Sequence, residues 1–247
     1  MLLKGKTAIV TGCNKGIGKK ILEVFSANGA TVFACVRNID EEFNSFSNVL
    51  TKKFNNQIIP IQLDLSDDNK IKEASNKIIN YNKNIDILIN NAATIHTAIF
   101  QMTSIKKLKE IFDVNFFSQT IFTQYILKSM IKNKKGSIVY ISSSSALDGN
   151  EGRSAYAATK AAIITQAKVL SRELGAHNIR VNSIAPGLTN TDMMQKNHKR
   201  EKIDEVISRT SLRRIGEPKE IANIVLLLAS DLTSYITGQN IRVDGGM

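Results

Sequence analysis

The stretch Thr7-Ala8-Ile9-Val10-Thr11-Gly12-Cys13-Asn14-Lys15-Gly16-Ile17-Gly18 decides the fold of this 247-residue chain. Its apolar start is typical of a buried parallel strand, and an amphipathic stretch from Lys19 to Asn28 follows its glycines. Glycines let a backbone approach a ligand closely, and a helix N-terminus offers free N–H groups. Strand, glycine turn and helix together predict a phosphate-binding loop. The spacing differs from the general Gly-x-Gly-x-x-Gly fingerprint, so a glycine-rich turn without ligand is the alternative.

The same alternation of strand and helix continues along the chain. Apolar runs predict further strands at 31–35, 58–63, 85–89, 137–141, 178–184 and near 240–243. Helical stretches lie between them, the longest at about 104–132 and 155–175. We therefore predict an α/β fold in one domain over residues 1–247: a Rossmann-like, doubly wound parallel sheet of about seven strands with helices on both faces.

Composition excludes several classes of protein. Hydrophobic residues make up 43% and charged residues 22%, which is ordinary for a globular chain. No apolar run is long enough for a membrane span, and no signal-peptide pattern is present, so we expect a cytoplasmic protein. Cys13 and Cys35 give neither a disulfide framework nor metal-ligand spacing, and we expect no metal site. The net charge of +11 comes without a nucleic-acid-binding motif, and an acidic partner or substrate and a compositional bias toward lysine are the two interpretations left open.

The end of the second predicted strand indicates which dinucleotide would bind. NAD-selective sites usually carry an acidic side chain at this point, but here the strand ends in Val36-Arg37. Arg37 can bind a 2′-phosphate, and Lys15 in the glycine loop can supply a second positive charge. The pair favours NADP(H); two solvated surface cations are the alternative.

Tyr156 and Lys160 stand four residues apart in a predicted helix and therefore share one face. A phenol titrates near about 10, and a nearby cation lowers that pKa, which suits acid–base catalysis at neutral pH. The serine run 142–145 follows the fifth strand, where ligands bind in open parallel sheets. Asn115 is a polar residue within an apolar helical stretch, and a bond to neighbouring backbone is its structural alternative.

Together these patterns resemble the short-chain dehydrogenase/reductase family over nearly the whole chain. The resemblance rests on Thr11-Gly12-x-x-x-Gly16-x-Gly18, Asn90-Asn91-Ala92, Asn115, Ser143 thirteen residues before Tyr156, Tyr156-x-x-x-Lys160, Pro186-Gly187 and Val243-Asp244-Gly245-Gly246. Ala93 replaces the glycine usual in the family, and we expect little effect from so small a residue. Ser143 is chosen from its serine run only by its spacing to Tyr156.

The resemblance implies catalytic roles for four residues. Tyr156 would donate the proton in reduction, and Lys160 would lower its pKa and bind the nicotinamide ribose. Ser143 would hold the substrate carbonyl oxygen, and Asn115 would anchor a water chain to Lys160. The hydride would come from the nicotinamide.

The resemblance also implies a set of NADP(H) contacts. They fall on Thr11, Gly12, Asn14, Lys15, Gly16, Ile17, Gly18, Arg37, Asp64, Leu65, Asn91, Ala92, Tyr156, Lys160, Pro186, Gly187, Leu188 and Thr189. The glycine loop would line the pyrophosphate, Asp64 and Leu65 the adenine, and Asn91 the adjacent ribose. Residues 187–189 would meet the carboxamide, and residues 189–213 would form a lid over the substrate.

Within the family, the chain resembles bacterial 3-oxoacyl-[acyl-carrier-protein] reductases. The likeness is carried by Thr191-Asp192-Met193, Arg214-Ile215-Gly216-Glu217-Pro218, Glu220-Ile221-Ala222 and Tyr235-Ile236-Thr237-Gly238. It implies NADPH-dependent reduction of a carrier-tethered ketone in fatty acid synthesis, by a homotetramer. Lys134, Lys135 and the basic lid would attract the acidic carrier protein. The alternatives are a related enzyme acting on a sugar, polyol or other small ketone, and a non-catalytic nucleotide-binding scaffold.

Overall fold

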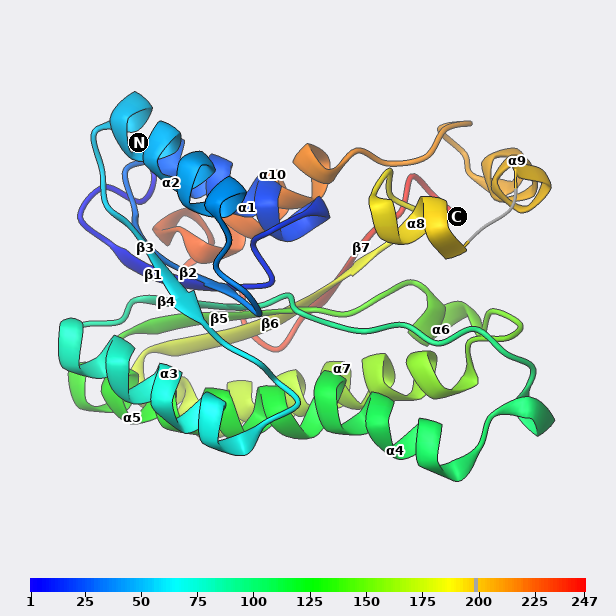
Figure 1. The fold of residues 1–247 in the computed structure, drawn as a ribbon, viewed down its shortest axis with the longest axis horizontal. Coiled ribbons are helices and arrows are strands. Elements are labelled where there is room, and N and C mark those ends of the chain that lie inside the picture. Colours follow the sequence, from blue (N-terminus) through cyan, green and yellow to red (C-terminus); the bar gives the residue numbers. More distant parts are fainter. Residues whose placement is uncertain (198–199) are drawn as a thin grey trace.

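A computed structural model describes residues 1–197 and 200–247 of the chain. Within these residues the strands form one seven-stranded sheet in the order β3-β2-β1-β4-β5-β6-β7, and every pairing is parallel (Figure 1). The strands are β1 (Thr7–Thr11), β2 (Thr31–Val36), β3 (Ile58–Gln62), β4 (Ile87–Asn90), β5 (Gly136–Ile141), β6 (Ile179–Pro186) and β7 (Asn240–Val243). This architecture confirms the predicted doubly wound α/β fold. The strand order reverses between β1 and β4, which is where such sheets bind ligands.

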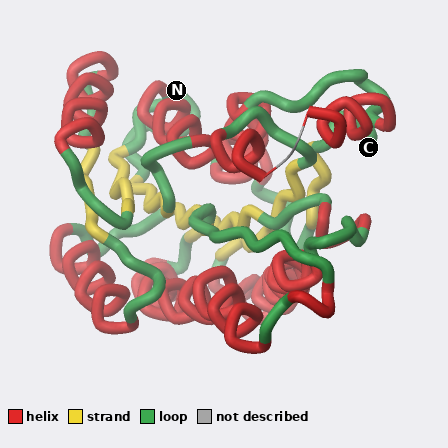
Figure 2. The backbone as a smooth tube through the Cα atoms, turned by 45° about the vertical axis from the view of Figure 1, so that its right-hand side comes forward, coloured by secondary structure: helices red, strands yellow, loops and turns green. Residues whose placement is uncertain are grey.

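Helices cover both faces of the sheet, as Figures 1 and 2 show. They are α1 (Gly16–Ala27), α2 (Glu41–Phe54), α3 (Asp68–Tyr81), α4 (Ile105–Phe112), α5 (Ser118–Asn133), α6 (Ser145–Asp148), α7 (Ser154–Leu174), α8 (Asp192–Asn197), α9 (Arg200–Arg209) and α10 (Pro218–Ala229). Helices α1, α2 and α10 lie on one face, and α3, α4, α5 and α7 lie on the other.

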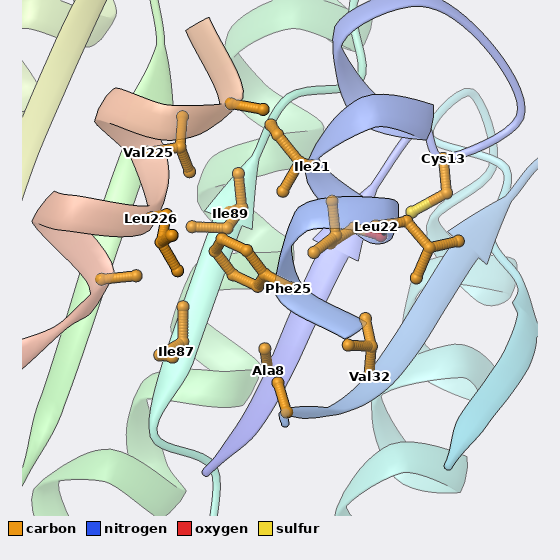
Figure 3. Packing of buried hydrophobic residues seen from close by; sticks show 14 of the residues in the cluster. Ala8, Cys13, Ile21, Leu22, Phe25, Val32, Ile87, Ile89, Val225 and Leu226 are labelled. Atoms are coloured by element: carbon orange, nitrogen blue, oxygen red, sulfur yellow. Dashed lines mark hydrogen bonds between the residues drawn. The ribbon is translucent and has the colours of Figure 1, made fainter. Parts of the chain in front are cut away.

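Successive residues of each strand face the two opposite helical layers. On β1, Ala8 and Val10 belong to the core beneath α1 and α10, whereas Ile9 belongs to the core on the other side. Figure 3 shows Phe25 of α1 lying among strand residues and Leu226 of α10. Because both faces are buried, the sequences of β1, β2, β4 and β5 read mainly as apolar runs rather than as alternating ones.

The predicted helix at about 104–132 is interrupted in the structure. Residues Asp113–Phe117 form a π-helical turn between α4 and α5, and Asn115 is fully buried in it. A wider turn of this kind re-aims side chains and backbone groups, and it is frequent at functional sites. The interruption places the Asn115 amide against the segment that follows β4.

The predicted lid region contains α8 and α9, which lie on the same side of the molecule as α6 (Figure 1). His198 and Lys199, two of its basic residues, lie outside the described residues. The lid function of residues 189–213 stays a prediction. Within the described part of the chain, no helix has the length and apolar character needed to cross a membrane.

Candidate active site at the carboxyl ends of the strands

Parallel pairing brings the segments after β4, β5 and β6 to one edge of the sheet, beside the glycine loop that follows β1. Backbone hydrogen bonds hold these segments together: the Ser144 N–H donates to the Pro186 carbonyl at 2.9 Å. The Gly187 N–H donates in turn to the Val243 carbonyl at 3.0 Å. Helix α7 begins at this same edge, because its C-terminus leads into the opposite end of β6.

Tyr156 lies in the first turn of α7 with 9% of its surface exposed, and the Ser143 side chain lies close enough to act on the phenol and lower its pKa. The neighbouring serine differs, since Ser142 donates its hydroxyl to the Lys160 carbonyl at 3.0 Å. The Ser143 Oγ also accepts the Ser145 N–H at 3.2 Å. Of the serine run, the structure therefore brings Ser143 to the phenol, the position that the sequence spacing singled out.

Lys160 is buried beneath Tyr156, with 1% of its surface exposed. Its Nζ donates to the Ile141 carbonyl at 2.6 Å and lies 5.7 Å from the centroid of the Tyr156 ring. Burial disfavours the charged ammonium and lowers the pKa of Lys160 to about 7.

The surroundings of the Tyr156 phenol act on its pKa in opposite directions. Burial raises the pKa of Tyr156, while Ser143 and the charge of Arg153 act to lower it. The Lys160 Nζ donates to the Ile141 carbonyl and also lies near the Tyr156 ring. The lowering of this pKa by Lys160 stays a prediction.

Asn115 uses its amide to join the segment after β4 to α7. Its Oδ1 accepts the Thr94 N–H at 2.8 Å, and its Nδ2 donates to the Thr94 carbonyl at 2.8 Å and to Thr159 Oγ1 at 3.2 Å. Thr159 in turn donates to the Tyr156 carbonyl at 2.7 Å. Asn115 thus reaches the helix of the candidate catalytic residues, and its role in a water chain to Lys160 stays a prediction.

The glycine loop is a close-packed cradle at the start of α1. Gly12 and Gly16 have positive φ angles of 72° and 54°, which side chains rarely adopt. A Cβ on Gly18 would lie 2.0 Å from the Gly12 carbonyl oxygen. No side chain in the described ranges caps the N-terminus of α1, and its first turn carries no acidic residue. The loop therefore fits an anionic group such as a dinucleotide pyrophosphate, held by backbone N–H groups.

Two predicted cofactor contacts shape this loop from within. The Thr11 hydroxyl accepts the N–H groups of Asn91 and Ala92, both at 3.0 Å, and Thr11 is 1% exposed. The Asn91 Nδ2 donates to the Thr11 and Gly12 carbonyls at 2.8 and 3.2 Å. The Thr11 side chain is thus enclosed between β1 and β4, and the predicted place of Thr11 along the pyrophosphate stays a prediction.

The predicted selectivity residues lie at the ends of neighbouring strands. Arg37 follows β2 and is exposed, as is Lys15 in the glycine loop. Asp64, after β3, accepts the N–H and the hydroxyl of Ser66 at 2.9 and 2.7 Å. These bonds, assisted by the charge of Arg37, hold the pKa of Asp64 below its usual range. Leu65 beside it is buried, and Asn14 in the loop is exposed.

The segment after β6 runs from the candidate catalytic serines to the glycine loop. The Leu188 carbonyl accepts the Gly216 N–H at 2.9 Å, and the Thr189 hydroxyl donates to the Gly187 carbonyl at 3.0 Å. A Cβ on Gly16 would lie 3.3 Å from Thr191 Cγ2, so the start of the predicted lid lies over the loop. Residues 187–189, the predicted carboxamide contacts, thus lie between the candidate catalytic serines and the glycine loop.

Sequence reasoning missed Arg153, the residue that precedes α7. It is 5% exposed, and its charge acts on Tyr156 three residues further along. Its spacing of three residues from Tyr156 was the signal that could have found it, because residues three apart lie on one face of a helix. The spacing does not show, however, that this arginine is buried while others are exposed.

Comparisons with known proteins agree with this geometry. A family profile described as enoyl-(acyl carrier protein) reductase matches residues 12–247. The 3-oxoacyl-[acyl-carrier-protein] reductase of Thermotoga maritima is 36% identical and covers 100% of this chain and 99% of its own. That of Chlamydia trachomatis is 38% identical, with coverages of 100% and 98%.

Solved structures are similar over the same length. A 7α-hydroxysteroid dehydrogenase complexed with NADH and 7-oxo glycochenodeoxycholic acid superposes with a TM-score of 0.91 at 32% identity, over 99% of this chain and 94% of its own. A protein from Beutenbergia cavernae with bound NADP, described as an NAD(P)-dependent gluconate 5-dehydrogenase, gives 0.93 at 28% identity, over 99% and 97%.

Proposed function

The chain belongs to the short-chain dehydrogenase/reductase family, and on that premise we propose that it is an NADPH-dependent reductase of carbonyl groups. Its substrate is a 3-oxoacyl-[acyl-carrier-protein], which it reduces to the 3-hydroxyacyl thioester in fatty acid synthesis. The names of its full-length relatives support this substrate.

The closeness of the Ser143 hydroxyl to the Tyr156 phenol, on which it acts to lower the pKa, carries the proposal. Two neighbouring hydroxyls can both address a single oxygen atom that gains negative charge in the reaction. A ketone offers such an oxygen at the reacting bond. An enoyl thioester also gains negative charge on an oxygen, that of its thioester carbonyl, when hydride adds to the conjugated double bond. The choice of ketone reduction over the enoyl reduction in the family profile's description is therefore supported by the 3-oxoacyl reductase relatives.

Each step of the proposed reduction is assigned to residues of the chain. Bound NADPH supplies the hydride. Ser143 orients the carbonyl oxygen, and Tyr156 gives that oxygen its hydroxyl proton, leaving a phenolate. Lys160 would hold the nicotinamide ribose, and its Nζ would join the Ile141 carbonyl to that ribose. The glycine loop would hold the pyrophosphate, with Arg37 and Lys15 on the 2′-phosphate.

The carrier protein would approach over the basic lid. Lys134 and Lys135, which the sequence also suggested for this role, precede β5 and therefore lie at the amino ends of the strands, away from Tyr156. Lys135 pairs there with Asp86 at 3.7 Å. Lys196, in α8, and Arg213, after α9, are exposed in the lid, which follows the carboxyl end of β6. We propose the lid as the carrier contact, and a cytoplasmic homotetramer as the assembly.

Substitution of Arg37 by aspartate is expected to remove the preference for NADPH. The change deletes a charge-assisted hydrogen bond worth about 1.5–3 kcal/mol and adds a repulsive charge, so the ratio of kcat/KM for NADPH over NADH should fall about 10- to 100-fold. Arg172→Asp, at the far end of α7, is the control for a change of net charge. Steady-state rates with both cofactors test this, and an unchanged ratio would show that Arg37 does not face the 2′-phosphate.

A substrate panel tests the proposed function itself. Acetoacetyl-[acyl-carrier-protein], keto-sugars and small ketones are compared by following NADPH absorbance at equal enzyme concentration. We expect the carrier thioester to have the highest kcat/KM. A keto-sugar with the higher value would replace the proposed substrate but keep the reaction class, and no NADPH oxidation by any ketone would indicate a nucleotide-binding scaffold.

A further inference from the structure

Helix α6 continues the candidate catalytic serine run, but little apolar packing holds it in place. It is a single helical turn of four residues, Ser145–Asp148, and none of the four is buried. A helix this short is marginal by itself, because its first turn fixes several residues for very few hydrogen bonds, and helices in proteins are stabilised mostly by a buried apolar face. Polar contacts therefore weigh more in setting the position of α6 than they do for a longer helix.

The position of α6 decides where the Ser143 hydroxyl lies. The N–H of Ser145, the first residue of α6, donates to Ser143 Oγ at 3.2 Å. The Ser143 carbonyl accepts the Ala146 N–H at 3.1 Å, so the same helical turn also holds the Ser143 backbone. Because Ser143 Oγ accepts a hydrogen bond from α6, its own proton is left to donate to another oxygen. A shift of α6 would therefore move the hydroxyl that is proposed to orient the substrate carbonyl.

Asp148, the last residue of α6, is held by Arg242 on β7. The Nη1 and Nη2 atoms of Arg242 donate to the two carboxylate oxygens of Asp148 at 2.8 and 3.0 Å, which makes the pair bidentate. The Arg242 Nε donates to the Asp244 carboxylate at 2.5 Å, and Nη2 also donates to the Met247 carbonyl at 3.0 Å. One guanidinium thus uses all three of its nitrogens to join α6 to β7 and to the residues that follow β7.

The segment on which Arg242 rests is anchored to the sheet and to the end of the predicted lid. Strand β7 pairs with β6, and the Asp244 side chain, 8% exposed, accepts the Gly246 N–H at 3.1 Å. The Gly246 carbonyl in turn accepts the N–H and the hydroxyl of Ser211 at 3.2 and 2.9 Å. Because these bonds hold Arg242 from the side of the sheet, its bidentate contact can fix the position of α6.

We propose that Arg242 is a positioning residue for Ser143: through Asp148 it holds α6, and through α6 it holds the Ser143 hydroxyl toward the substrate carbonyl oxygen. The proposal deepens the reductase function above and rests on it. The Arg242 and Asp148 side chains are 36% and 30% exposed, and exposed ion pairs add little to the free energy of unfolding. A bidentate pair is nevertheless specific in its direction, so its contribution here is to geometry more than to stability.

Amide hydrogen exchange tests the contact without substrate or cofactor. The N–H groups of residues 146–149 donate within this turn, and they exchange when it opens. We expect Arg242→Met to speed exchange in a peptide covering the turn by about two- to fivefold, while peptides from β1 and β4 keep their parent rates. Arg214→Met is the matched control, because it removes an exposed arginine from a bidentate pair with Glu220 at 2.8 and 2.7 Å. It should leave exchange in α6 unchanged.

Kinetics show whether Arg242 acts through Ser143. Arg242→Met should lower kcat for reduction of acetoacetyl-[acyl-carrier-protein] about tenfold and leave NADPH affinity unchanged, because a misplaced Ser143 affects the reacting oxygen but not the glycine loop. In a Ser143→Ala background the same substitution should lower kcat by less than about twofold, since the group that it positions is absent. Arg242→Lys keeps the charge without the bidentate fork and should recover part of the loss.

The remaining outcomes separate this proposal from the proposed function. A tenfold loss that persists in Ser143→Ala, or that comes with weaker NADPH binding, would overturn the positioning role. Unchanged exchange in Arg242→Met, with an active parent, would refute the contact while the reductase function stands. If the parent reduces no ketone, the proposed function fails, whereas faster exchange in Arg242→Met still supports the hold on α6. Should Arg242→Met not fold, Asp148→Asn breaks the same bidentate pair at its exposed end and carries the same expectations.

Discussion

Replacement of Tyr156 by phenylalanine is expected to reduce kcat for carbonyl reduction by about 10³-fold, the middle of the range for a positioned general acid. The variant removes one oxygen atom from a ring that is 9% exposed, so it leaves the packing of α7 against β5 in place. The proton then has to come from water, and Ser143 remains alone on the carbonyl oxygen. NADPH binding should persist, because the glycine loop and Arg37 are untouched.

The measurement is a pair of experiments on one variant: steady-state reduction of acetoacetyl-[acyl-carrier-protein], and NADPH affinity from the cofactor's fluorescence. Tyr140→Phe is the matched control, because Tyr140 is also buried and its hydroxyl bonds to Thr123 Oγ1 at 3.2 Å away from the site. That variant should lose about 1 kcal/mol of stability and keep its activity. Full carbonyl reduction by Tyr156→Phe would refute the proposed chemistry.

The fold was predictable because its causes are local. Parallel strands buried on both faces need apolar runs, and Ala8-Ile9-Val10 and Ile87-Leu88-Ile89 have that form, followed within two residues by glycine or asparagine where the chain must turn. The spacing of Tyr156 and Lys160 needs only one helix, and the thirteen residues from Ser143 bring its loop back to that helix. These relations follow from the regular backbone geometry of helices and strands, so residue spacing in the sequence is enough to predict them.

What could not be predicted depends on burial and on competition for hydrogen bonds. A spacing of four residues places Lys160 near Tyr156, but only the tertiary structure shows that its ammonium meets the Ile141 carbonyl instead. Likewise, only the tertiary structure shows that the Thr11 hydroxyl accepts the N–H groups of Asn91 and Ala92 and is enclosed against β4. Arg153 escaped notice because its exposure, not its identity, sets it apart from other arginines.

Gly18→Ala is expected to destroy dinucleotide binding, with NADPH affinity reduced by about 100-fold or more, an amount that corresponds to about 2.7 kcal/mol. The added Cβ would lie 2.0 Å from the Gly12 carbonyl oxygen and 2.5 Å from the Asn91 Nδ2. The first of these is a backbone atom and cannot rotate away, so the turn between β1 and α1 has to open. Opening it also displaces the Asn91 amide that bridges the Thr11 and Gly12 carbonyls.

The sign of the change in stability on Gly18→Ala distinguishes a clash at this position from free space. In a helix with free space, alanine is more favourable than glycine by about 1 kcal/mol, so a harmless Gly18→Ala would raise the melting temperature. The clash predicts the opposite, a loss of about 1–3 kcal/mol typical of overpacking. Gly175→Ala is the matched control: Gly175 follows α7 in a right-handed helical conformation, and a Cβ there meets nothing within 4 Å. Thermal unfolding and NADPH titration of both variants test this prediction. A Gly18→Ala protein that is more stable than the parent and binds NADPH normally would show that the glycine loop does not hold the dinucleotide.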